Sequence, residues 1–128
     1  MGVLTAEMKE MIEALCLCYV ATVTPDGRPN LSPKGSLRVW NDDHLVFADI
    51  ASPVTVRNLR ANPGIEINIV HPFLRRGYRF KGVAEIVDEG EVYDYVAEEL
   101  WRREGPQYPV NSVIVVTVEE ARPVMSPA

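Results

Sequence analysis

The chain has 128 residues, of which 47% are hydrophobic and 24% charged, so it is long enough for one domain with a real core and too short for two. Its formal net charge of −5 argues against a nucleic-acid partner, which would favour a basic face. No apolar run is long enough to span a bilayer, and Glu7, Glu10 and Glu13 do not fit a signal peptide. We therefore expect a cytoplasmic protein with no membrane partner.

The charges are spread unevenly along the chain. Residues 28–81 hold nine of the 13 basic side chains and four of the 18 acidic ones, which gives this segment a net charge of +5 against −10 for the rest. A cationic centre in an acidic protein fits a small anionic ligand better than a polyanion. Scattered, solvated charges would give the same count, so this pattern alone leaves both interpretations open.

The cysteines and histidines do not indicate a metal site. Cys16 and Cys18 are one residue apart, which seldom allows disulfide geometry and is not a C-x-x-C motif. His44 and His71 have no acidic residue at ligand spacing. We expect two reduced, buried thiols and no bound metal.

Hydrophobic periodicity divides the chain into three helices and six strands. Thr5 is a preferred N-cap, and Ser52 followed by Pro53 is typical of a helix start, because Ser caps the first turn and Pro tolerates the first helical position. Pro25-Asp26-Gly27 is typical of a tight turn. The predicted helices cover residues 5–17, residues 52 to the break at 62–64, and residues 89–104; the predicted strands cover residues 18–24, 28–40, 44–49, 65–70, 78–87 and 112–119; residues 122–128 are expected to be loose.

These elements favour a mostly-β α+β fold. Six strands, mostly linked as hairpins with short helices inserted, predict a six-stranded antiparallel barrel with peripheral helices, in a single domain over residues 1–128. The strand over residues 112–119 is almost continuously apolar, which predicts burial on both of its faces.

Two segments offer donors for an anion. Leu31-Ser32-Pro33-Lys34 carries a hydroxyl and an ammonium, and Pro33, which cannot donate to a sheet ladder, suits an edge strand. The helix start at Ser52 offers free backbone N–H groups, the Thr55 hydroxyl and nearby Arg57, and the helix dipole favours negative charge there. A capped connector helix has the same pattern, so the residues leave both interpretations open.

Four short motifs occur in an order that resembles a known family. They are D-G-x-P-x-x-S-P-K-G, a strand ending in F-A-D, T-x-x-N-L-x-x-N-P, and a strand with R-F-x-G. Together they resemble the FMN-binding split-barrel family, which includes pyridoxamine-phosphate-oxidase-related flavoproteins and small bacterial FMN-binding proteins. The resemblance covers about residues 18–87, with the terminal strand also in place. It implies a six-stranded split barrel that forms a homodimer and holds FMN, a flavin nucleotide, near the subunit interface.

The resemblance also implies a set of cofactor contacts on three strands and one helix start. Many relatives have a lysine or arginine where Val54 stands, so the phosphate here is expected to rest on Ser52, Thr55 and a cation from elsewhere, such as Arg57. The implied contacts are Asn30, Leu31, Ser32, Pro33 and Lys34 along the ribityl chain and flavin ring, Ala48 and Asp49 at the ring, Ser52, Val54, Thr55 and Asn58 around the phosphate, and Arg79 at a basic position of a later strand.

The C-terminal segment departs from the pyridoxamine phosphate oxidases, which resemble one another in an Arg/His-rich closing segment that grips the substrate. Residues 118–123 contain no histidine and one arginine, Arg122. We therefore expect an FMN-binding flavoprotein, either an oxidoreductase or an electron carrier, that is not a pyridoxamine phosphate oxidase. The alternatives are a split-barrel binding or sensor module that uses haem or a deazaflavin, and a ligand-free dimer that acts through its surface.

Overall fold

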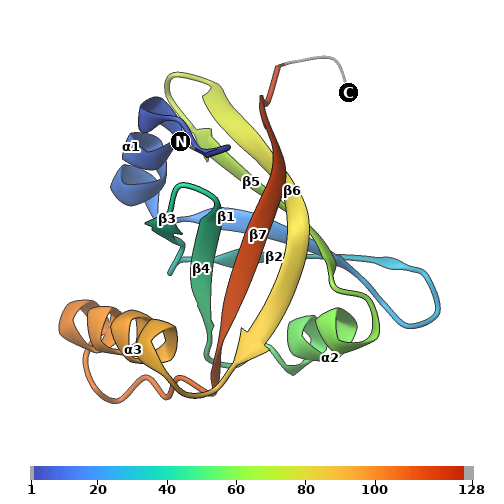
Figure 1. The fold of residues 1–128 in the computed structure, drawn as a ribbon, viewed down its shortest axis with the longest axis vertical. Coiled ribbons are helices and arrows are strands. Elements are labelled where there is room, and N and C mark those ends of the chain that lie inside the picture. Colours follow the sequence, from blue (N-terminus) through green and yellow to red (C-terminus); the bar gives the residue numbers. More distant parts are fainter. Residues whose placement is uncertain (1, 126–128) are drawn as a thin grey trace.

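The computed structural model describes residues 2–125, which form a curled antiparallel sheet with three helices around it (Figure 1). Among these residues, no helix is long and apolar enough to cross a membrane. The strands are paired in the order β2-β1-β5-β6-β7-β4-β3. The elements are α1 (Ala6–Leu15), β1 (Cys18–Val23), β2 (Pro29–Lys34), β3 (Arg38–Asn41), β4 (His44–Asp49), α2 (Pro53–Ala61), β5 (Gly64–His71), β6 (Arg76–Val87), α3 (Glu91–Glu104) and β7 (Ser112–Pro123).

The mostly-β α+β class is confirmed, but the six-stranded barrel is corrected to seven strands in an open sheet. The strand expected over residues 28–40 is two strands, because the backbone leaves the ladder after Lys34. The Leu37 N–H donates to the Cys16 carbonyl (3.1 Å), after which β3 pairs with β4 instead of β1. β2 and β3 are therefore the two edges of the sheet, and Pro33 lies on an edge strand as predicted.

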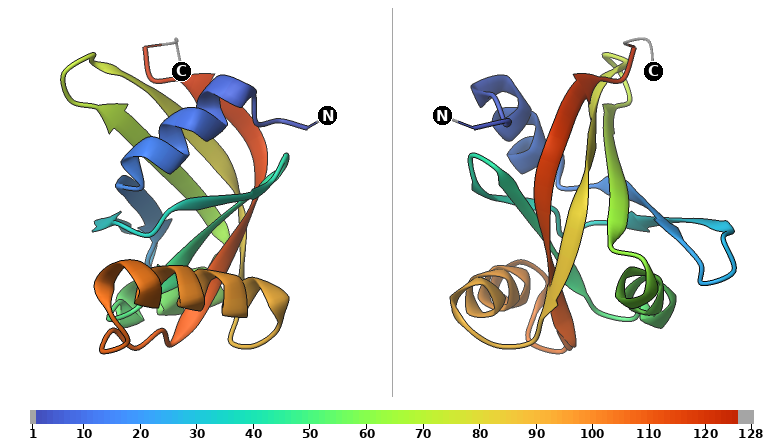
Figure 2. Two further views of the ribbon diagram at one scale, coloured as in Figure 1. Left: turned by 90° about the vertical axis from the view of Figure 1, so that its left-hand side faces the viewer. Right: turned by 45° about the vertical axis from the view of Figure 1, so that its right-hand side comes forward.

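One hydrophobic core fills the concave side of the sheet. Phe47, Ile67, Phe80 and Ile114 are fully buried there and come from four different strands. Thr5 caps α1 as predicted, by accepting from the Met8 N–H (3.3 Å), and the apolar face of α1 covers one end of this core. Figure 2 shows α1 at one end of the curled sheet and α2 and α3 at the other end.

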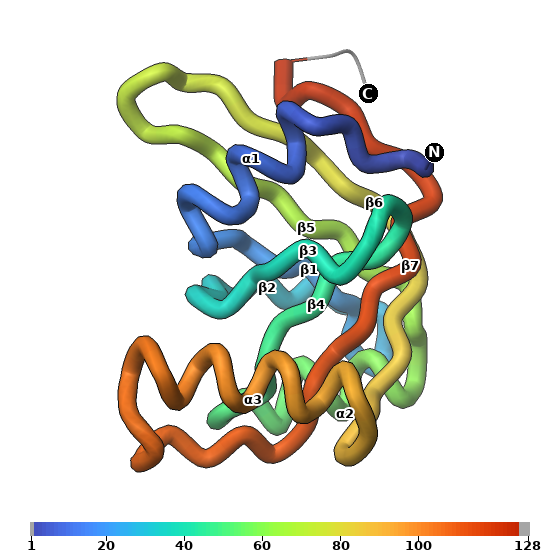
Figure 3. The backbone as a smooth tube through the Cα atoms, turned by 60° about the vertical axis from the view of Figure 1, so that its left-hand side comes forward, coloured from blue at the N-terminus to red at the C-terminus, as the bar shows by residue number. Residues whose placement is uncertain are grey.

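A second hydrophobic cluster fixes α3 against the outer side of β4 and β7 (Figure 3). Val96 and Leu100 of α3 pack there with Val46 and Val113. Residues 112–116 are therefore covered on both faces, because the core lies on one side and α3 on the other. The predicted burial over residues 112–119 ends there, since Thr117 and Glu119 are exposed.

The end of β7 differs from the expectation of a loose tail. Arg122 and Pro123 belong to the strand, where they pair with Arg79 and Tyr78 of β6. The last part of that predicted tail, residues 126–128, lies outside the described residues.

Replacing Gly82 by alanine should lower the free energy of unfolding by about 3 kcal/mol, which is the upper end of the usual range for substitutions that overpack a core. A Cβ at Gly82 would overlap the carbonyl oxygen of Thr117, which belongs to the central β6–β7 pair and has no room to move. Chemical denaturation measures the loss. Gly35→Ala is the control: a Cβ at Gly35 meets nothing within 4 Å, so its change should stay within about 0.5 kcal/mol. Equal losses in the two variants would contradict this account.

Candidate functional site

A cleft of about 310 Å³ lies between the end of β2, the segment that follows β4, and the C-terminal end of α3. Four of the residues that the sequence analysis assigned to the cofactor line it: Pro33, Lys34, Ala48 and Ser52. These residues come from two segments that are far apart in the edge-to-edge order of the sheet. Lys34 lies on the inner side of β2, whereas Ala48 belongs to the outer side of β4 that α3 covers, so residues from both faces of the sheet line this cleft.

Lys34 and Ser52 meet in this cleft. Lys34 points to the inner side of the sheet with its β1 partner, the fully buried Cys18, and its Nζ donates to Ser52 Oγ. Burial lowers the pKa of the Lys34 ammonium, and the negative charge of Asp49 acts in the opposite direction. A partly desolvated ammonium forms stronger charge-assisted hydrogen bonds than a solvated one. The Lys34 ammonium is therefore well suited to hold an anion.

Asp49 ties together the turn before α2. Its Oδ1 accepts from the Ser52 N–H (3.0 Å), and its Oδ2 accepts from the Ser112 hydroxyl (3.3 Å). The side chain is buried, and a buried carboxylate is tolerated when its oxygens have donors. These two hydrogen bonds fix where α2 begins.

The start of α2 has Pro53 in its first turn, as predicted, but Ser52 does not cap the helix with its side chain. The Ser52 hydroxyl contacts Lys34 instead. No side chain within residues 2–125 caps the first turn, where Val54 is 39% exposed and Thr55 is buried. Backbone donors at a helix start favour an anion.

Two buried polar atoms, one on β2 and one on α2, lack a hydrogen-bond partner in the described part of the chain: Ser32 Oγ and Asn58 Oδ1. Asn58 is fully buried, and its Nδ2 donates to Thr22 Oγ1 (3.0 Å), which ties α2 to β1. Ser32 lies on the same inner side of β2 as Lys34. An unpartnered buried polar atom costs about 1–3 kcal/mol. Such atoms are a sign of a site that a ligand or water completes.

Arg79, Leu31 and Arg57 are not brought to this cleft. Arg79 lies on the outer face of β6, where its Nε donates to Glu66 (3.3 Å), and Leu31 is 69% exposed on the outer face of β2. Three strand spacings, roughly 14 Å, separate β6 from β2. The side chains of Arg79 and Leu31 point to the outer side of the sheet, whereas Lys34 points to the inner side. Arg57 lines a separate cleft of about 460 Å³ with Arg60.

The C-terminal end of α3 contributes a wall of the cleft that no sequence motif indicated. Arg103 and Tyr108 line the Lys34 cleft, and the Arg103 Nη2 donates to the Gly35 carbonyl (3.2 Å). The Trp101 Nε1 donates to the Tyr108 carbonyl (2.7 Å), which holds the segment after α3 in place. No local signal identifies this wall, since Gly35 and Arg103 are 68 positions apart.

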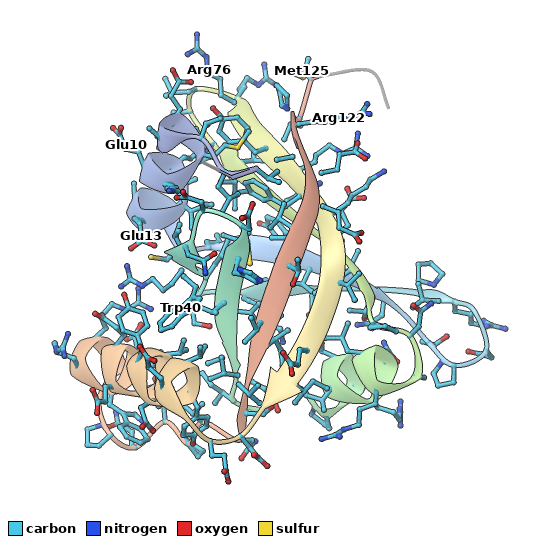
Figure 4. All side chains as sticks on the ribbon, in the orientation of Figure 1. Glu10, Glu13, Trp40, Arg76, Arg122 and Met125 are labelled. Carbon is cyan, nitrogen blue, oxygen red and sulfur yellow. The ribbon has the colours of Figure 1, made fainter. Side chains whose placement is uncertain are left out.

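The position of α3 is fixed by its contacts with β3. The Trp40 ring meets the Tyr95 ring edge to face, with centroids 5.6 Å apart. Figure 4 shows Trp40 extending from β3 toward α3. Arg38 joins three elements, since it pairs with Glu13 of α1 (3.0 Å) and with Glu99 of α3 (3.7 Å). The wall of the cleft is therefore anchored on the frame of the sheet.

The chain that forms this cleft matches a known protein family. Residues 4–125 match the family model described as Pyridoxamine 5'-phosphate oxidase. The chain belongs to this family. The family resemblance stated from the motifs is thereby confirmed, and the match extends well beyond residues 18–87 at both ends. No curated protein matches the chain.

Solved structures share the fold over nearly the whole chain. HupZ of Group A Streptococcus, in a tagged form, is 35% identical, with a TM-score of 0.87 and coverage of 98% of this chain and 97% of that one. An FMN-binding protein of Syntrophomonas wolfei is 18% identical (TM-score 0.85, coverage 94% and 86%). HutZ, the haem storage protein of Vibrio cholerae, is 23% identical (TM-score 0.72, coverage 95% and 94%). The last two likenesses show the fold alone.

The Cys18 thiol should resist alkylation by iodoacetamide at neutral pH in the folded protein. Burial raises its pKa to about 12, and the thiolate is the reactive form. Above the ordinary pKa of 9.0, the thiol loses its proton in the unfolded chain but keeps it in the native protein. The free energy of unfolding therefore falls as the pH rises above 9.0. In the Cys16→Ser variant, Cys18 is the remaining cysteine. Mass spectrometry before and after denaturation then measures the alkylation of Cys18 alone. Rapid alkylation of this folded variant would contradict the burial.

Proposed function

We propose that this protein is an FMN-binding flavoprotein, an oxidoreductase or electron carrier, with the cofactor held in the Lys34 cleft. The observation that carries the proposal is the contact between the partly buried Lys34 ammonium and Ser52 at an uncapped helix start. On the strand that carries Lys34 and on the helix that follows Ser52, Ser32 Oγ and Asn58 Oδ1 are buried without partners in the described part of the chain, as expected of polar groups that a ligand completes. Membership of the family supports flavin as that ligand.

The proposed roles follow from where each group lies. The phosphate would meet the N–H groups of Val54 and Thr55 together with the Ser52 hydroxyl, and Lys34 would supply the cation that a residue at position 54 supplies in many relatives. Arg57 opens onto a separate cleft, so Lys34 is the better candidate for this charge. When bound, FMN supplies the redox chemistry, and the protein supplies position and electrostatics.

The remaining proposed cofactor contacts lie on two different faces of the sheet. Asn30 and Ser32 share the inner side of β2 with Lys34 and would lie along the ribityl chain, while Ala48 would meet the ring. Arg79, on the outer face, cannot reach a cofactor held by its own chain in this cleft. A cofactor that lies near a subunit interface would meet Arg79 of the partner subunit.

A homodimer is therefore part of the proposal. The outer face of the sheet carries exposed apolar side chains, among them Tyr19, Leu31 and Val83. Exposed apolar side chains that share one face are typical of a protein–protein interface. The substrate is proposed to differ from that of pyridoxamine phosphate oxidases, since residues 118–123 contain no histidine and one arginine, unlike the Arg/His-rich closing segment of those enzymes.

Titration of the purified protein with FMN should quench the flavin fluorescence at a ratio of one FMN per chain. Lys34→Ala combined with Thr55→Ala should weaken binding by about 3 kcal/mol, because charge-assisted hydrogen bonds contribute about 1.5–3 kcal/mol each. Lys9→Ala is the matched control: Lys9 pairs with Asp42 on the other side of the molecule and should not matter. Thermal unfolding should show that all variants are folded.

Other outcomes of this experiment identify the alternatives. A Soret band in the spectrum of the protein as isolated would indicate haem and contradict the proposal. An unchanged thermal stability in excess FMN would favour a ligand-free protein, since FMN at 100 times its Kd should add about 2.7 kcal/mol.

Leu31→Asp should convert the proposed dimer into a monomer. A carboxylate that is buried in an apolar interface loses its hydration, which costs on the order of several kcal/mol when the charge is left unpaired. Light scattering coupled to size-exclusion chromatography gives the molar mass. Phe73→Asp is the control, because Phe73 is more exposed than Leu31 but lies at the β5–β6 turn, away from this face. A monomeric wild-type protein would contradict the proposal.

A further inference from the structure

A chain of two contacts connects Asp49 to Lys34. The Asp49 carboxylate accepts from the Ser52 N–H, and the Ser52 hydroxyl accepts from the Lys34 ammonium. The Ser112 hydroxyl holds the second carboxylate oxygen from the neighbouring strand, directly opposite in the β4–β7 pair. The carboxylate is therefore fixed from two sides, and through Ser52 it determines where the ammonium rests.

Asp49 itself does not face the Lys34 cleft. The cleft is lined by Ala48 and by Ile50 to Ser52, but not by Asp49, whose accessible side turns to the separate cleft of Arg57. Both carboxylate oxygens already accept a hydrogen bond. This placement does not match the contact with the flavin ring that the family resemblance implied for Asp49.

We propose that Asp49 is the positioning residue of this site: it presents the Ser52 hydroxyl to Lys34 and keeps the Lys34 ammonium protonated and aimed into the cleft. Its consequence for FMN rests on the function proposed above, but the effect on Lys34 itself does not. The role is electrostatic as well as geometric, because burial lowers the pKa of Lys34 and the charge of Asp49 raises it.

Other groups also face Lys34. Cys18 lies opposite on β1, and burial keeps its thiol protonated far above neutral pH. Arg103, Glu104 and Tyr108 line the cleft from α3 and the segment after it. Among these groups, Asp49 is the main one that raises the pKa of Lys34.

Two substitutions separate charge from geometry. Asp49→Asn keeps the shape and both hydrogen bonds, because the amide oxygen can accept from the Ser52 N–H and the amide NH₂ can donate to the Ser112 hydroxyl, but it removes the charge. Ser112→Ala removes one of the hydrogen bonds and keeps the charge. If Asp49 acts through its charge, only the first substitution changes the titration of Lys34.

The titration is measured on the ligand-free protein by carbon-13 NMR of the lysine Cε resonances. The chain has three lysines, Lys9, Lys34 and Lys81, and Lys34→Gln assigns the one of interest. In Asp49→Asn the midpoint of Lys34 should move to lower pH, while Ser112→Ala should leave it in place. Identical midpoints in wild-type protein and Asp49→Asn would overturn the proposal, and so would an equal shift in Ser112→Ala.

FMN affinity is then followed from neutral to alkaline pH. Affinity should fall as Lys34 loses its proton, and in Asp49→Asn this fall should begin at lower pH. Lys34→Gln should bind at least about tenfold more weakly and lack this step, so any pH dependence that remains in this variant does not come from Lys34. A fall at the same pH in Asp49→Asn and wild type would overturn the role in binding. If the wild-type protein binds no FMN, the proposed function fails, and the NMR titration still decides the role of Asp49.

Discussion

The buried Asp49 carboxylate joins three segments that the order of the chain keeps apart. It ends β4, accepts from the first residue of β7, and accepts from the residue that precedes α2. A carboxylate in this environment requires donors at both oxygens, so the three segments cannot separate without leaving a buried charge unpaired. The start of α2, and the cleft beside it, take their position from this requirement.

The two-residue period of the strands divides the functional residues between two surfaces. Ser32 and Lys34 alternate with Leu31 and Pro33 along β2, so the first pair faces the interior and the second faces outward. The same alternation turns Arg79 of β6 outward. Lys34 and Arg79 therefore lie on opposite faces of one chain's sheet, although the resemblance implies both as contacts of one cofactor.

The sequence predicts best where the signal is local. Two strands and one helix start follow from the hydrophobic period and the end residues alone: the strand that begins at Ser112, the strand His44–Asp49 and the helix start at Ser52-Pro53. The break between β2 and β3 is not local: Ser36 Oγ accepts from the Ala48 N–H (2.9 Å), which draws the chain across to β4. The cap of α2 fails for the same reason, because Lys34, 18 positions earlier, takes the Ser52 hydroxyl. The wall formed by α3 depends on contacts between residues that are far apart in the sequence, which residue spacing does not predict.

An ammonium beside the start of a helix is electrostatically unfavourable, because the exposed N–H groups there already carry partial positive charge. Here the Lys34 ammonium and the first turn of α2 occupy the same region, and Asp49 is the carboxylate that offsets them. Its oxygens accept from the Ser52 N–H and the Ser112 hydroxyl, so Asp49 acts on the Lys34 ammonium through its charge and through Ser52. An anion bound beside Lys34 and the first turn of α2 would add a second favourable negative charge, which is the physical argument for the phosphate proposed there.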